Sequence, residues 1–289
     1  MNLVYLVFGD ELKNHVQTNL SLLTFLKASE INSVNIITDK PEFYNQVSTF
    51  VKIIPVSDHQ LTEWKGEHDF FWRIKIKAIE LIANMYKGED ILYVDSDTFL
   101  FSENVNKIQE FLSNGYSFMH LNEGKLSQLN TKTEKRMWNQ VKNNTFGGVK
   151  ITEETCMWNA GIISISGAKS NQIIQLTLDI CDDMLQANVT RRLIEQFSFS
   201  VALNKCSKLI PAENYIGHYW GNKQEWNSFI TNFILKSYFQ KHTVEEQIED
   251  LKGFDFSAMP IFVKESNTKK RIVNLLNYIF EKNNKVYIK

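Results

Sequence analysis

The sequence predicts an α/β protein with a largely parallel central sheet that helices cover on both faces. Short, continuous apolar runs recur in the first hundred residues, and each is followed by turn-forming residues. Such runs are typical of strands buried on both faces. Segments with helical spacing of apolar residues separate several of these runs, and this alternation indicates parallel strands joined by crossover helices. The length of 289 residues fits one large domain, or one domain with an appendage.

The expected elements follow one another in a simple order. They are a strand at 3–8, a helix at 11–27, strands at 34–38 and 51–56, a helix at 70–86 and a strand at 91–94. Asp10, Asp39 and Asp95 each fall just beyond a strand end. Because ligands of parallel sheets bind at the carboxyl ends of the strands, we expect these three carboxylates on one rim of the sheet.

The second half of the chain has a less regular pattern. Residues 104–150 are polar and mixed, and we expect a loop-rich excursion there. Residues 162–165 are typical of a further strand, and residues 170–204 have helical spacing, as do the last 60 residues.

Composition excludes several classes of function. A net charge of −1 excludes a general nucleic-acid binder, which needs a basic excess. No apolar run approaches the roughly 20 residues of a membrane-spanning helix, and residues 1–5 lack the basic residues that begin a secretory signal. The three cysteines are far apart and show no C-x-x-C spacing. We therefore expect no disulfide framework and a cytoplasmic location.

The segment with the clearest chemical signal is the strand at 91–94 followed by Asp95-Ser96-Asp97. It delivers two carboxylates, one residue apart, into a turn. Hard divalent cations take carboxylate oxygens and keep open positions for phosphate oxygens. The alternative is a turn in which the two aspartates only cap backbone amides.

Two cations precede this strand on the expected helix at 70–86. Arg73 and Lys77 are four residues apart and share one face. At the helix start they would suit a phosphate or a sugar hydroxyl. The alternative, which we favour from this segment alone, is a solvated helix face.

Three further segments carry polar groups suited to a carbohydrate or metal site. Asn159 and Gly161 open the strand at 162–165 with an amide and a close backbone approach. Glu195-Gln196 lies on a helical segment, where a surface position is the ordinary alternative. The last segment joins an imidazole, two glycines, a lysine and aromatic rings within ten residues, among them His218, Gly221, Lys223 and Trp226.

Taken in their order along the chain, these segments resemble the metal-dependent glycosyltransferases of the GT-A fold. The similarity is greatest to the glycogenin-like and lipopolysaccharide-galactosyltransferase group of retaining enzymes. It covers roughly residues 1–227, and it implies a GT-A catalytic domain there with a helical extension at 228–289. The GT-A fold has a Rossmann-like, mostly parallel sheet flanked by helices, in agreement with the α/β pattern.

The resemblance assigns a role to each motif. In that group the Asp-x-Asp pair binds Mn²⁺, so Asp95 and Asp97 are implied to hold Mn²⁺ or Mg²⁺ and, through it, a nucleotide-sugar diphosphate. His218, with Gly221 and Trp226, keeps the spacing of the family segment H-x-x-G-x-x-K-P-W and is implied to be the third ligand. Lys223 stands one place early for the diphosphate-binding lysine, and Gln224 holds the expected position.

The remaining motifs are implied to contact the donor and the reacting sugar. Asn159 and Gly161 would approach the sugars, and Glu195-Gln196, with Glu where the family usually has Asp, would lie beside the reacting sugar. Arg73 and Lys77 would contact the donor, and Asp10 and Asp39 would lie near the nucleoside.

The expected activity is transfer of a hexose from a nucleotide sugar, with UDP the favoured nucleotide, to a saccharide or glycolipid acceptor in polysaccharide biosynthesis. The resemblance favours retention of configuration; in an inverting enzyme Glu195 would instead be the base. The main alternative is a nucleotide-sugar binding protein without catalysis. A sugar nucleotidyltransferase is disfavoured because Gly9-Asp10-Glu11 is not a glycine-rich, arginine-containing loop, and a metal hydrolase because the six histidines are scattered.

Two compositional features remain. Residues 264–289 carry a net charge of +5 beside helically spaced apolar residues, which leaves −6 on the rest of the chain. That pattern suits peripheral contact with an anionic membrane surface, and the alternative, which we favour slightly, is a docked terminal helix with a solvated basic face. The aromatic content is 12%, and we expect the four tryptophans within the motifs, Trp72, Trp158, Trp220 and Trp226, to serve a carbohydrate site rather than the core.

Overall fold

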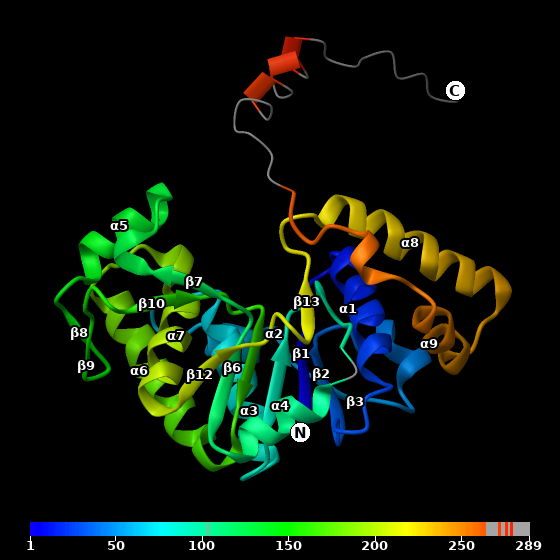
Figure 1. Ribbon diagram of the computed structural model, residues 1–289, viewed down its shortest axis with the longest axis horizontal. Helices are drawn as coiled ribbons and strands as arrows, with labels where there is room; N and C mark the ends of the chain where they lie inside the picture. The colour runs from blue at the N-terminus through cyan, green and yellow to red at the C-terminus, as the bar shows by residue number, and fades with distance from the viewer. Residues whose placement is uncertain (103, 264–270, 273–274, 277, 280–289) are drawn as a thin grey trace.

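The computed structural model describes residues 1–102, 104–263, 271–272, 275–276 and 278–279. Within these residues the central sheet has the strand order β12-β6-β11-β4-β1-β2-β3 (Figure 1). Its strands are β1 Asn2–Leu6, β2 Ser33–Thr38, β3 Lys52–Pro55, β4 Ile91–Val94, β6 Tyr116–Met119, β11 Ile162–Ile165 and β12 Lys208–Pro211. All neighbouring pairs are parallel except those of β11, which runs antiparallel to β4 and β6. The expected α/β class with a mainly parallel sheet is confirmed.

Helices cover both faces of this sheet. They are α1 Leu12–Phe25, α2 Asp58–Trp64, α3 Arg73–Met85, α4 Val105–Ser113, α5 Lys132–Val141, α6 Ser170–Gln186, α7 Ile194–Cys206, α8 Lys223–Gln240 and α9 Val244–Lys252. Figure 1 shows α6 and α7 on one side of the sheet, and α1, α8 and α9 on the other. Three small antiparallel pairs complete the described strands: β5 Thr98–Leu100 with β13 Ile216–His218, β7 Asn122–Lys125 with β10 Cys156–Trp158, and β8 Thr145–Phe146 with β9 Val149–Lys150.

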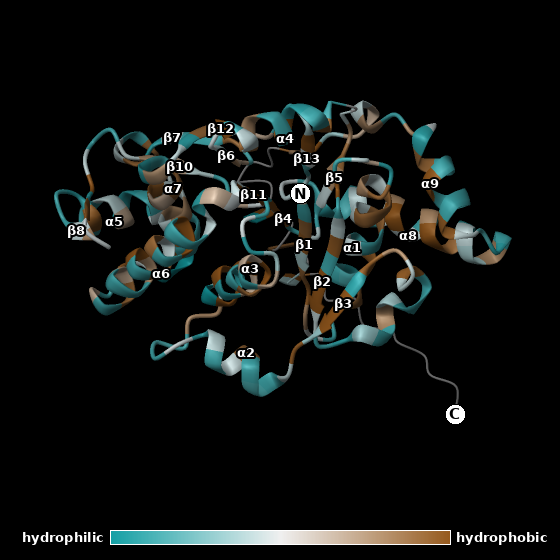
Figure 2. Ribbon diagram, turned by 90° about the horizontal axis from the view of Figure 1, so that it is seen from below, coloured by the Kyte–Doolittle hydropathy of each residue, from teal (hydrophilic) through white to brown (hydrophobic). Residues whose placement is uncertain are grey.

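The burial of β4 explains why its sequence is continuously apolar. Ile91 and Tyr93 belong to the core shared with α3, α6 and α7, whereas Leu92 and Val94 belong to the core shared with α1 and α8. Successive side chains of a strand point to opposite faces, and here both faces are covered. Figure 2 shows hydrophobic residues on β2 and β3 and hydrophilic residues on outer helices such as α6 and α9.

Two sequence expectations differ from the structure. Residues 104–150 are not simply a loop-rich excursion, because they contain α4, α5 and the central strand β6. The boundary expected at residue 227 falls inside α8. Ile230, Val244 and Leu251, beyond that boundary, share a core cluster with Leu3 of β1. This region therefore packs on the sheet domain, chiefly through contacts of α8 and α9 with α1.

Membrane contact was one of two interpretations of residues 264–289, and most of that segment lies outside the described residues. In the part of the chain that the structure describes, no helix combines the length and the hydrophobicity needed to cross a bilayer.

Candidate active site

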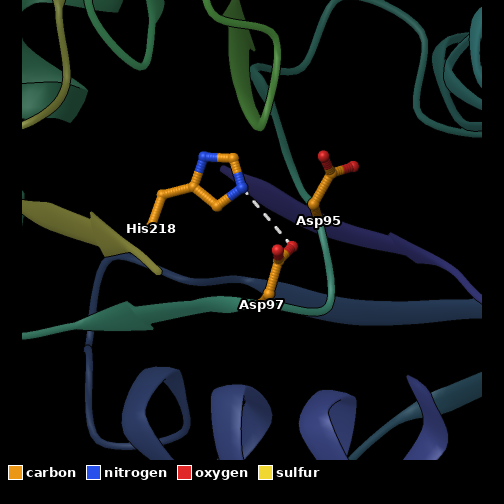
Figure 3. Close-up of side chains that lie close together, drawn as sticks. All are labelled: Asp95, Asp97 and His218. Carbon is orange, nitrogen blue, oxygen red and sulfur yellow. Dashed lines mark ion pairs between the residues drawn. The ribbon is translucent and has the colours of Figure 1, made fainter. Parts of the chain in front are cut away.

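The strand-end aspartates and His218 converge through the pairing of two short strands. Asp95 and Asp97 lie in the turn between β4 and β5, and His218 is the last residue of β13. Because β13 runs antiparallel to β5 with His218 opposite Thr98, the imidazole is brought over Asp97 (Figure 3). One ligand atom from each of the three residues lies within 4.8 Å of the others. The three motif residues expected to bind metal are therefore neighbours in space.

Asn159 and Gly161 hold the imidazole in place. His218 Nδ1 lies 3.1 Å from Asn159 Oδ1, which also accepts a hydrogen bond from the Gly161 amide at 3.0 Å. The Gly161 carbonyl in turn accepts a hydrogen bond from the Asp95 amide at 2.8 Å. A Cβ at Gly161 would overlap the His218 ring, so only glycine lets the ring lie this close to the backbone. This segment thus connects His218 and Asp95.

Asp97 is a buried carboxylate that lies between His218 and Lys223. Its side chain lies 3.4 Å from His218 Nε2, and its other oxygen lies 2.7 Å from Nζ of Lys223. Burial alone would raise the pKa of Asp97, but the hydrogen bond and charge of His218, together with Lys223, outweigh it and lower that pKa. Asp97 is therefore ionised at neutral pH and available to a cation.

Lys75, which the sequence reasoning missed, joins the other aspartate to Glu195. Its ammonium lies 3.2 Å from Asp95, 3.2 Å from Glu195 and 3.2 Å from the Ala160 carbonyl oxygen. Burial opposes the charge on Lys75, yet the two carboxylates prevail and raise its pKa. Burial raises the pKa of Glu195, and Lys75 opposes that rise. The buried ammonium thus compensates two carboxylates that face the same space.

Arg73 and Lys77 are not part of this cluster, which corrects their expected placement. Arg73 forms a bidentate ion pair with Asp182 of α6, and Lys77 pairs with Glu80 on its own helix. Both line a separate cavity of about 720 Å³, which contains neither aspartate of the metal group. An α-helix turns about 100° per residue, so Lys75 points almost opposite to Arg73 and Lys77.

If the cleft binds the nucleotide-sugar donor that the resemblance implies, replacing Arg73 with alanine should leave the affinity for that donor unchanged. We expect the donor KM to change by no more than about twofold. The free energy of unfolding should fall by about 1 kcal/mol, because the partly exposed ion pair to Asp182 is lost. Steady-state kinetics and urea unfolding measure the two effects. A tenfold or larger rise in donor KM would show that Arg73 reaches the substrate.

Glu123 is a second residue that sequence reasoning missed. It lies on β7, and its carboxylate accepts hydrogen bonds from Gln196 Nε2 at 2.8 Å and Asn159 Nδ2 at 3.4 Å. Burial raises the pKa of Glu123, and these two hydrogen bonds oppose the rise. Glu123 thus fixes the amides of two motif residues at the same cavity wall.

Two cavities meet at the aspartates. One of about 550 Å³ is lined by Glu123, Asn159, Gly161, Glu195, Gln196, His218 and other residues. The other, of about 280 Å³, includes Phe8 and Phe71 in its lining. Trp72, Lys75, Asp95, Asp97 and Lys223 line both. The cleft therefore has a polar chamber and a partly aromatic one, and the metal group lies at their junction.

The tryptophans of the motifs divide into two pairs. Trp72 and Trp220 are 43% and 47% exposed and line the larger of these two cavities, as a carbohydrate site would require. Trp158 and Trp226 are core residues, contrary to expectation. Trp226 is fully buried, because its ring stacks on Tyr219 at 4.5 Å and on Phe99 at 4.6 Å.

Three further residues of the expected site lie outside the two cavity linings: Asp10, Asp39 and Gly221. Asp39 follows β2 and accepts hydrogen bonds from the Gly9 amide at 3.0 and 3.2 Å. Asp10 pairs with Lys40 at 2.7 Å and is largely exposed. Both stand at the carboxyl ends of neighbouring strands, as expected, but neither lines the cavities at Asp97. Gly221 packs against Phe262 instead of facing the cleft.

The chemistry of the three candidate metal ligands fits a divalent cation. Two carboxylates and one imidazole offer oxygen and nitrogen ligands without a thiolate, and carboxylate-rich sites suit Mg²⁺ and Mn²⁺. The imidazole is oriented from behind by an amide, as metal-binding histidines usually are. The residues present therefore match the requirements of a divalent-metal site.

Comparisons with known proteins find similarity in structure. No family model matches the chain, and no curated protein is similar in sequence. Among solved structures, the crystal structure of mouse xyloside xylosyltransferase 1 in its apo form is similar, at 12% sequence identity and a TM-score of 0.49. The alignment covers 73% of this chain and 84% of that chain. At this level of similarity, the function has to be argued from the site itself.

Proposed function

We propose that this protein is a metal-dependent glycosyltransferase of the GT-A type. It would move a hexose from a nucleotide sugar, with UDP as the nucleotide, to a saccharide or glycolipid acceptor. The observation that carries the proposal is the convergence of Asp95, Asp97 and His218, beside Lys223, at the carboxyl end of a mainly parallel sheet. A nucleoside diphosphate that departs from a sugar needs its charge neutralised, and this group gathers metal ligands and a cation at one point.

The leaving diphosphate would lie at the junction of the two cavities. Asp95, Asp97 and His218 would hold Mn²⁺ or Mg²⁺, which when bound supplies Lewis-acid stabilisation of the diphosphate. Lys223 is paired with Asp97 and half exposed, so its flexible ammonium can turn toward a phosphate oxygen when a metal takes that carboxylate. The nucleoside would occupy the smaller cavity, where Phe8 and Phe71 offer aromatic surface.

The reacting sugar would occupy the larger cavity with the acceptor. Asn159, Gln196 and Glu123 line it with amide and carboxylate groups, which bind sugar hydroxyls. The ammonium of Lys75 lies between Asp95 and Glu195 and joins the sugar side of the cleft to the metal side.

Retention of configuration is the outcome we propose. Glu195 is buried and paired with Lys75, and it is not a free carboxylate waiting for an acceptor proton. A paired carboxylate and the neighbouring amide of Gln196 suit stabilisation of positive charge on the sugar during departure of the diphosphate. In a retaining reaction the acceptor approaches from the face of the leaving group, so no strong protein base is required.

A thermal-shift panel of nucleotide sugars, with and without Mn²⁺, tests the donor assignment. We expect UDP and UDP-hexoses to raise the melting temperature only when Mn²⁺ is present, because the diphosphate would bind through the metal. Stabilisation without turnover of any donor would indicate a binding protein on the same fold. A flat response across the whole panel would contradict the proposal.

A further inference from the structure

A segment far along the chain lies against the loop that carries Lys223. We call residues 260–263 the strap and residues 219–223 the cleft loop. The Pro260 carbonyl accepts hydrogen bonds from Asn222 Nδ2 at 2.8 Å and from Trp226 Nε1 at 3.1 Å. Phe262 and Gly221 form a parallel β-bridge, and the Val263 amide donates to the Gly221 carbonyl at 3.3 Å.

The side chain of Phe262 completes this contact. Its ring lies 5.1 Å, centroid to centroid, from the ring of Trp220. A Cβ at Gly221 would overlap the Phe262 ring, so glycine allows that ring to lie directly on the loop backbone. The Phe262 side chain is 50% exposed, so the ring covers the cleft loop from the solvent side.

The cleft loop is held at two places. On the inner side, the Tyr219 amide donates to the Asp97 carbonyl at 3.1 Å. On the outer side, the strap pairs with Gly221 through the β-bridge and accepts a hydrogen bond from Asn222. Between and beside these anchors stand Trp220, which lines the larger site cavity, and Lys223, which contacts Asp97. Without the strap, the outer contacts at Gly221 and Asn222 would be lost, and the loop would keep the inner anchor, the Lys223–Asp97 ion pair and its connection to α8.

We propose that the strap is a positioning element of the active site, in which Phe262 orients Trp220 and Lys223 toward the cleft. This inference rests on the proposed function, because Trp220 and Lys223 would serve there to align the acceptor and the diphosphate of the donor. Small misplacements of such groups lower the rate strongly, and preformed contacts avoid the entropy cost of ordering them at each turnover. Phe262 is not itself part of either cavity lining and would act through the residues of the cleft loop that it contacts.

The test compares full-length variants of the strap and the loop. Phe262→Ala and Gly221→Ala should each lower kcat/KM for the donor by about tenfold, while the melting temperature changes by no more than about 2 °C. Phe262→Tyr should restore activity to within about twofold because it keeps the ring. The double variant should be no worse than either single one, because both break the same contact. Phe239→Ala, which removes another exposed ring, is the matched control and should be unchanged.

A second readout does not depend on catalysis. Trypsin cleavage after Lys223, followed by mass spectrometry, reports the opening of the cleft loop and the start of α8. We expect faster cleavage in Phe262→Ala and Gly221→Ala, and the wild-type rate in Phe262→Tyr. If wild-type protein transfers no sugar but cleavage follows this pattern, the strap does hold the cleft loop and the proposed function is wrong. Unchanged kinetics and unchanged cleavage in Phe262→Ala would contradict the proposed role of the strap.

Discussion

Replacing Asp97 with asparagine is expected to abolish metal-dependent sugar transfer while the protein stays folded. The amide would keep the shape of the side chain but remove the charge that lies between His218 and Lys223. Residues that merely orient a ligand already change metal affinity by about 10- to 100-fold, so loss of a ligand charge should cost more than about 100-fold. Titration of Mn²⁺ followed by electron paramagnetic resonance measures the affinity, and far-UV circular dichroism checks the fold.

The pH dependence of stability provides a control for this variant. The pKa of Asp97 is lowered in the folded protein, so its charge stabilises the fold above the unfolded value of about 3.9 and that contribution is lost as pH falls. The loss of stability at acid pH should accordingly be shallower in Asp97→Asn than in wild type. Wild-type Mn²⁺ affinity in this variant would contradict the metal assignment.

Replacing Lys75 with methionine should damage both stability and activity. Methionine keeps an unbranched chain of similar length, but Asp95 and the buried Glu195 would face each other without their common counter-charge. Removing one partner of a buried ion pair costs about 3 kcal/mol of unfolding free energy, which urea denaturation measures. Transfer should fall by at least about 100-fold, because the metal side and the sugar side of the cleft lose their connection.

Two comparisons sharpen the Lys75 experiment. Lys77→Met on the same helix removes a lysine that points away from the cleft, and it should behave like wild type in transfer. The stability deficit of Lys75→Met should shrink as pH falls from neutral, because burial raises the pKa of Glu195 and its protonation removes the like-charge repulsion with Asp95. A variant as stable and active as Lys77→Met would show that the Lys75 bridge is dispensable.

The parts of the fold with continuous apolar runs could be predicted from the sequence. The bounds of β4 and β11 agree with the expected 91–94 and 162–165, because both strands are buried on both faces and end at polar turns. β6 and β12 were missed. β6 is short and includes Ser117, and β12 begins with an exposed lysine and ends with Pro211, so neither gives a strong periodic signal.

The cleft itself could be predicted only where its residues are close in sequence to strand ends. Asp95 and Asp97 follow β4 directly, and their neighbourhood could be inferred from that strand alone. Choosing Lys75 over Arg73 required the rotation of α3, and that rotation depends partly on Asp182, 109 residues away. Glu123 lies on a short polar strand whose partner is β10, so no local pattern marked it.

The aromatic residues show the same limit. Trp226 keeps the spacing of a family motif, yet it stacks on the buried rings of Tyr219 and Phe99 and on the partly buried ring of Phe256. A stack built from residues so far apart in sequence cannot be read from local spacing. Trp72 and Trp220 remain the aromatic residues placed to contact a sugar.

The most direct test of the central proposal is release of UDP from UDP-hexoses by wild type and Asp97→Asn, each with Mn²⁺ and with a chelator. We predict that UDP is released only by wild type with Mn²⁺, as the hexose is transferred to an acceptor or, slowly, to water. Release that persists in the chelator, or that is equal in Asp97→Asn, would contradict a metal-dependent transfer at the site of Asp95, Asp97 and His218.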